Sequence, residues 1–127
     1  MIKNVIFEKR KLTIISNTNE SNNIDLESTI QDVVFKEDRV VVLLKGLELF
    51  DTAYHNCNIV CYDEYGDLIW RIENPDKLST SKIKTYNTFQ NISLKNDKKI
   101  EAYLDSGYMV EIDIETGQFV GDWRFIK

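Results

Sequence analysis

The residues that could carry metal or nucleophile chemistry lie close together, at His55, Cys57 and Cys61. A structural zinc site needs four ligands, and this motif offers three. In a strand the two cysteines would lie about 13 Å apart on one face, too far for a disulfide. His55 and Cys57 could share a strand face, but nothing near them would activate a thiolate. We therefore predict no metal, no cofactor and two free, buried thiols.

The carboxylates form the second chemical group. Glu111 and Asp113 share one face of an expected strand, and Glu101 could lie opposite Glu111 on its neighbour. Carboxylate pairs perform acid–base catalysis in glycoside hydrolysis, but no aromatic platform or cleft motif accompanies these. The sequence also lacks a phosphate-binding glycine loop, a G-x-S-x-G motif and a zinc helix motif. We predict that the protein is not an enzyme.

Two hairpins must position these groups. Residues 58–72 and 108–125 each read as two runs of β-branched and aromatic residues around a turn, at Gly66 and Gly117. Such runs favour pleated, half-buried strands, and glycine allows a positive φ between them. Both second strands carry Trp-Arg, and we expect Trp70 and Trp123 to anchor the core.

Further hairpins are expected over residues 4–16, 30–45 and 89–104. Residues 40–44 are apolar on both faces, which is typical of a central strand covered on both sides. The asparagine-rich stretch 17–23 and the polar stretch 76–88 are expected to be loops. The pattern predicts an all-β single domain over 1–127 with about ten antiparallel strands. We expect two blade-like four-stranded meanders, repeated over approximately 30–72 and 89–125, plus an N-terminal hairpin, in a sandwich or partly open barrel.

The repeated unit resembles a blade of the quinoprotein-type β-propeller. In that family an Asp-x-x-Thr-Gly-like turn joins the third and fourth strands, and the fourth strand carries tryptophan. Glu64-Tyr65-Gly66 and Glu115-Thr116-Gly117 stand where this turn would be. No residue here matches a quinone or metal site of the family. Two blades cannot close a ring, so the resemblance implies a sandwich of blade-like sheets or a subunit of a propeller-like assembly.

The net charge is −5, and the sequence pI is about 4.9. This charge argues against nucleic acid and against an anionic membrane surface as partners, and it suits a basic protein partner. Acids gather at the two hairpin turns, with tyrosines beside them as contact area. The alternative is that these are two solvated turns. The candidate partner-binding residues are Asp63, Glu64, Asp67, Glu111, Asp113, Glu115, Tyr62, Tyr65 and Tyr108.

In size, charge and lack of a catalytic motif, the chain resembles by type the immunity proteins of bacterial polymorphic and contact-dependent toxin systems. That resemblance implies a non-catalytic binding protein that covers the active site of a basic toxin domain, such as a nuclease. The alternatives are a small-ligand-binding β-barrel and a scaffold subunit of a propeller-like assembly. The first residues show no apolar signal core, and the longest apolar run is Val40–Leu44. We therefore expect a cytoplasmic protein.

Overall fold

The computed structural model describes residues 1–50, 54–73, 75 and 88–125, with the side chains of 122–125 left out. Its strands form three antiparallel meanders. Sheet A holds β1 (Ile2–Glu8), β2 (Lys11–Ser16) and β3 (Ser21–Asp25). Sheet B holds β4 (Ile30–Lys36), β5 (Arg39–Leu44), β6 (Ile59–Asp63) and β7 (Leu68–Arg71). Sheet C holds β8 (Phe89–Leu94), β9 (Lys99–Leu104), β10 (Tyr108–Asp113) and β11 (Phe119–Phe125).

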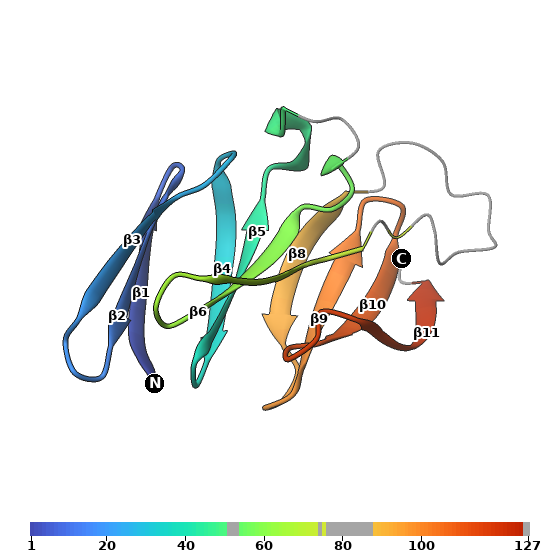
Figure 1. Ribbon diagram of the computed structural model, residues 1–127. Helices are drawn as coiled ribbons and strands as arrows, with labels where there is room; N and C mark the ends of the chain where they lie inside the picture. The colour runs from blue at the N-terminus through green and yellow to red at the C-terminus, as the bar shows by residue number, and fades with distance from the viewer. Residues whose placement is uncertain (51–53, 74, 76–87, 126–127) are drawn as a thin grey trace.

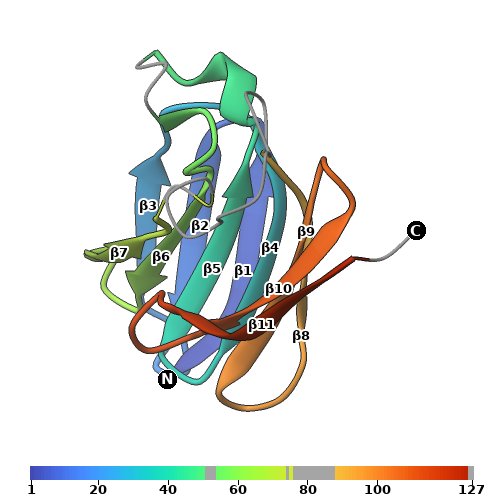
Figure 2. The ribbon, with the colours of Figure 1, turned by 90° about the vertical axis from the view of Figure 1, so that its right-hand side faces the viewer.

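The three sheets lie face to face, with sheet B in the middle (Figures 1 and 2). The first strands β1, β4 and β8 are neighbours. A short 3-10 helix, η1 (Gly46–Glu48), follows β5. Within the described ranges there is no helix with the length and apolarity to cross a bilayer.

Strand β5 shows why sheet B is central. Its side chains alternate between two apolar cores: Val41 and Leu43 face sheet C, whereas Val40, Val42 and Leu44 face sheet A. All five are buried. The expectation of a strand covered on both faces is therefore confirmed, and each half of the molecule depends on this strand for its core.

The all-β architecture and the two four-stranded meanders are confirmed, and none of the described sheets closes into a barrel. The expected N-terminal hairpin gains a third strand, β3, so the expectation of a loop over 17–23 was wrong for residues 21–23. The period-two pattern there has only one apolar residue on its inward face: Asn22 and Ile24 are half-buried, and their neighbours are exposed. Asn23 accepts a hydrogen bond from Thr13 Oγ1 (2.7 Å), which ties β3 to β2.

The outer face of sheet C carries the acid pair expected from the sequence. Glu101 and Glu111 lie directly opposite each other on β9 and β10. Like charges in this position destabilise a sheet, and cations offset them here: Lys95 lies 2.5 Å and Lys99 3.7 Å from the Glu111 carboxylate. Outer faces of this polar kind are typical of the terminal units of stacked repeats.

Successive sheets interlock through a repeated contact. The indole N–H of Trp70, on β7, donates to the Ile114 carbonyl in the β10–β11 turn (2.7 Å), and its ring lies against Gly117. Trp70 is buried, as expected from the sequence. One sheet earlier, Asn22 Nδ2 donates to the Glu64 carbonyl in the β6–β7 turn (3.1 Å). Each of these turns is thus held by a side chain of the preceding sheet. The side chains of Trp123 and Arg124, and residues 76–87 of the expected loop, lie outside the described part.

Candidate partner-binding rim

Two of the candidate acids build the turns themselves. Asp63 Oδ1 accepts hydrogen bonds from the backbone N–H groups of Tyr65 (2.9 Å) and Asp67 (3.0 Å). Asp113 Oδ1 accepts from the N–H groups of Glu115 (2.8 Å) and Thr116 (3.3 Å). An aspartate that bonds the backbone two residues on is a standard turn former. These two carboxylates are therefore committed to local structure.

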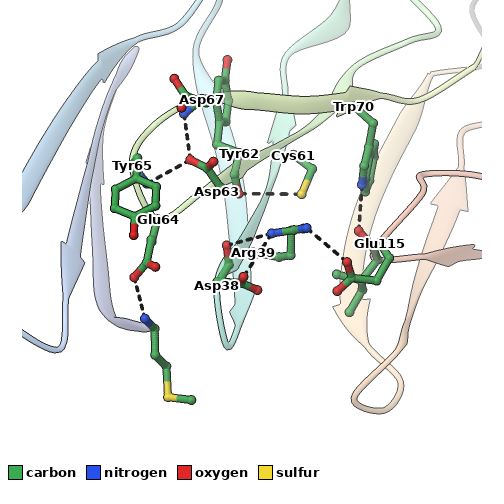
Figure 3. A network of polar contacts seen from close by, with 12 residues as sticks. Asp38, Arg39, Cys61, Tyr62, Asp63, Glu64, Tyr65, Asp67, Trp70 and Glu115 are labelled. Atoms are coloured by element: carbon green, nitrogen blue, oxygen red, sulfur yellow. Dashed lines mark hydrogen bonds and ion pairs between the residues drawn. The ribbon is translucent and has the colours of Figure 1, made fainter.

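The two turns lie along one end of the sheets, on either side of the β4–β5 turn. Arg39, at the start of β5, pairs with Asp63 across the β5–β6 ladder. Its guanidinium lies 3.3 Å from Asp38 and 3.1 Å from Glu115, so it joins the turns of sheets B and C (Figure 3). Arg39 is only 19% exposed, whereas Asp38 and Glu115 are 51% and 64% exposed. The cation is therefore covered, and the acids face solvent.

More acids join this end than the sequence analysis identified. Lys36 pairs with Asp97 of the β8–β9 turn (3.1 Å), the Ile2 N–H bonds the Glu37 carbonyl, and the Asn17 N–H bonds the Met1 carbonyl. These contacts bring three sheet turns, β2–β3, β4–β5 and β8–β9, together with the start of β1. The signal in the sequence is that alternate turns of a meander emerge at the same end. We define the acidic rim as Glu20, Glu37, Asp38, Glu64, Asp67, Asp97 and Glu115.

The tyrosines divide between the rim and the core. Tyr65 is 65% exposed in the β6–β7 turn, and the Glu64 carboxylate beside it is the main cause of the raised pKa of its hydroxyl. Tyr62 packs against the core between sheets A and B, and burial raises its pKa. Tyr108 stands at the start of β10, the opposite end of that strand from the turn. Of the three, Tyr65 is the one placed at the rim.

Glu111 lies apart from the rim, on the outer face of sheet C. It is 17% exposed and paired with two lysines. A hollow of about 380 Å³ opens at the sheet A end of the rim. Glu64 borders it and lies 2.5 Å from the N-terminal amine of Met1. The lining residues are Met1, Ser16, Asn17, Thr18, Glu20, Asn22, Glu64 and Tyr65.

Within the described ranges, His55, Cys57 and Cys61 do not form a cluster that could hold a metal ion. The His55 ring lies 3.1 Å from the Leu49 carbonyl, and Cys57 and Cys61 are buried thiols. Burial raises the pKa of the Cys61 thiol to about 12, even with Arg39 nearby. A thiol held protonated in this way is a poor nucleophile.

The buried Cys61 predicts a pH dependence of stability. In the unfolded chain the thiol ionises near its ordinary pKa of about 8.5, and in the fold it stays neutral to about 12. The contribution of the neutral Cys61 thiol to folding stability is complete below the pKa of the unfolded chain, and it is lost as the pH rises from there towards 12. We expect about 2 kcal/mol of this loss by pH 10. Urea unfolding at pH 7.5 and 10 measures it, with Cys61→Ala as control. Equal losses in both proteins would contradict the assignment.

Comparison with known proteins supports the fold. The computationally designed Ika8 protein aligns with 99% of this chain and 37% of its own length, at 14% identity and a TM-score of 0.55. The designed Ika4 protein aligns with 96% of this chain and 71% of its own length, at 15% identity and a TM-score of 0.53. HIRA(644-1017) aligns with 94% of this chain and 38% of its own length, at 14% identity and a TM-score of 0.52.

The chain thus spans well under half the length of Ika8 and of HIRA(644-1017), and at these identities the likeness concerns the fold alone. No curated protein matches the chain. A family described as "Domain of unknown function (DUF7957)" matches residues 2–122.

Proposed function

Because the chain belongs to the DUF7957 family, whose description gives no function, we propose a function from the geometry: the protein is a non-catalytic binding protein whose acidic rim docks a basic protein domain. The observation that carries the proposal is the arrangement at Arg39. This covered cation ties the turns of two sheets together, while its partners Asp38 and Glu115 remain 51% and 64% exposed. The rim is held in place before any partner arrives, which lowers the entropy lost on binding.

The mechanism we propose is that of an immunity protein. A nuclease-type toxin domain binds its substrate through clustered lysine and arginine. A rigid row of carboxylates would occupy the same cationic surface, speed the encounter by electrostatic attraction and cover the active site. Tyr65, the exposed aromatic beside Glu64, would supply contact area. Such an interaction fits a cytoplasmic protein that meets its toxin inside the cell.

The alternatives lack such an observation. A small-ligand barrel needs a closed sheet around its cavity, and the described sheets stack without closing. A propeller-like assembly would have to bury the outer faces of sheets A and C. Those faces carry polar groups such as Thr13 and Asn23 on one side and the ion-paired Glu111 on the other. A single-chain mass in solution is the expected result of sedimentation analysis.

Charge reversal at the rim tests the proposal. Asp67→Lys with Glu115→Lys removes two exposed acids and leaves the turn-forming Asp63 and Asp113 intact. We expect binding to a basic nuclease domain encoded beside this protein to weaken about 100-fold, mainly through a slower association rate. The measurement is surface plasmon resonance at low and high salt, together with protection of cells that express the nuclease.

The matched control applies the same charge change away from the rim. Glu8→Lys with Asp25→Lys alters two exposed acids at the other end of sheet A, where both lie opposite Lys11 on the neighbouring strands. We expect an affinity within about threefold of the parent, since distant exposed charges are screened. Equal losses in both double variants, or none in either, would rule out the acidic rim as the docking surface.

A further inference from the structure

Sheet A stops one strand short of its two neighbours. Sheets B and C each continue beyond their third strand, with β7 and β11, whereas among the described residues sheet A ends at β3. Two backbone hydrogen bonds flank the β2–β3 ladder: the Ser16 N–H donates to the Glu20 carbonyl, and the Leu26 N–H donates to the Arg10 carbonyl. Glu20 and Leu26 therefore direct their backbone groups towards β2, and so do the even-numbered residues of β3 between them. In an antiparallel ladder the alternate residues direct both backbone groups the other way. At the free edge of β3 these residues are Ser21, Asn23 and Asp25.

The neighbouring sheet shows what a fourth strand places here. Trp70 of β7 bonds the Ile114 carbonyl and fills the space over the β10–β11 turn. In sheet A the equivalent bond, to the Glu64 carbonyl, comes from the shorter side chain of Asn22 on the third strand. The hollow of about 380 Å³ lies beside Asn22, against the β6–β7 turn. It is thus the counterpart of the space that Trp70 occupies one sheet later.

The lining of this hollow favours a cation. Glu20 and Glu64 both border it, with the exposed ring of Tyr65 at its side. Glu64 already bonds an ammonium group in this structure, that of Met1, at 2.5 Å. A carboxylate placed for an ammonium group makes a charge-assisted hydrogen bond with a lysine or arginine equally well. An aromatic ring beside it adds a face on which the cation can lie.

We propose that the free edge of β3 is a docking strand for an extended segment of the partner protein. The segment pairs with Ser21–Asp25 as the fourth strand of sheet A and places a lysine or arginine side chain in the hollow, between Glu20 and Glu64. Main-chain hydrogen bonds supply the affinity, and the hollow supplies the side-chain preference. The inference rests on the proposed function for one point, the basic charge of the partner.

A strand-forming peptide tests the inference directly. The probe is a blocked decapeptide of alternating valine and lysine, and the control is a proline–lysine decapeptide of the same charge, which cannot form a strand. We expect the first to bind at least about tenfold more tightly, as one or two added hydrogen bonds allow. Amide exchange followed by nuclear magnetic resonance should slow at Ser21, Asn23 and Asp25. The N–H groups of Asn22 and Ile24, already turned towards β2, should change little.

A matched pair of variants separates strand pairing from charge attraction. Asn23→Pro removes an outward N–H and leaves the β2 ladder intact, because proline is tolerated where the N–H faces solvent at a sheet edge. Asn23→Ala keeps that N–H. We expect only the proline variant to lose about tenfold in peptide affinity. Glu64→Gln should reduce binding by a similar factor and abolish the preference for lysine over norleucine in the peptide.

The inference fails if both peptides bind equally, if the two Asn23 variants behave alike, or if the three outward amides keep their exchange rates when peptide is bound. The amide exchange uses the unaltered protein, so it decides even if the proline variant does not fold. The proposed function is judged separately, through Asp67 and Glu115. One outcome separates the two proposals. If charge reversal at the rim abolishes nuclease binding and Asn23→Pro leaves it unchanged, the acidic rim is supported and the docking strand is ruled out.

Discussion

Replacing Asn58 by leucine is expected to destabilise the protein by about 3–5 kcal/mol. This is the range for removing one member of a buried hydrogen-bond network and leaving its partners unsatisfied. Asn58 is fully buried. Its Nδ2 donates to the carbonyls of Leu44 and Phe89 (both 2.9 Å), and its Oδ1 accepts from the Phe89 N–H (3.0 Å). The side chain thus joins the end of β5 to the start of β8. Leucine has similar volume and leaves three backbone groups without these partners.

Urea unfolding of the parent and of Asn58→Leu gives the difference in unfolding free energy. The control is Asn91→Leu, the same chemical change on an exposed position of β8, where we expect about 0.5 kcal/mol or less. A loss below about 1 kcal/mol at Asn58 would mean that water replaces its hydrogen bonds and that the two sheets do not need this side chain.

Replacing Gly117 by alanine is the second large effect, expected at about 3 kcal/mol or more from strain and overpacking together. Gly117 has φ +74°, which an L-residue rarely adopts. An added Cβ would also lie 2.4 Å from the Trp70 ring, inside van der Waals contact. The ring cannot move aside without breaking its hydrogen bond to Ile114 O.

The chain provides a matched control for this change at Gly121. That glycine has φ +72°, and an added Cβ would meet nothing within 4 Å. Gly121→Ala therefore measures the backbone strain alone, about 1 kcal/mol. The difference between the two variants in thermal or urea unfolding is the contribution of the Trp70 contact. Equal losses of unfolding free energy in the two variants would show that the Trp70 ring moves aside for the added methyl group. The contact between sheets B and C would then contribute little stability.

The parts of the fold that follow a local pattern were predictable. Val40–Leu44 is apolar at every position, which gave a strand covered on both faces, and the turns at Gly66 and Gly117 gave the two hairpins. Strand β3 was missed because its inward face has only one apolar residue beside Asn22, and asparagine favours turns when judged alone. Its place is set by partners distant in sequence, such as the Glu64 carbonyl.

The candidate site was predictable in composition and less so in arrangement. The sequence indicated acids at two turns. It could not show that the carboxylates of Asp63 and Asp113 accept hydrogen bonds from backbone N–H groups of their own turns. Asp38 and Asp97 were overlooked because each stands in a separate turn. They join the rim through Arg39 and Lys36, contacts that require the packing of one sheet on the next.

The two-faced strand β5 has a consequence for how the molecule folds and unfolds. Every sheet of the described part pairs strands that follow one another along the chain. Both apolar cores, however, end on the same strand. Loss of either flanking sheet would expose the apolar side chains on one face of β5 to solvent. Partial opening at one end therefore propagates through the centre, and the protein is expected to unfold in a single cooperative transition.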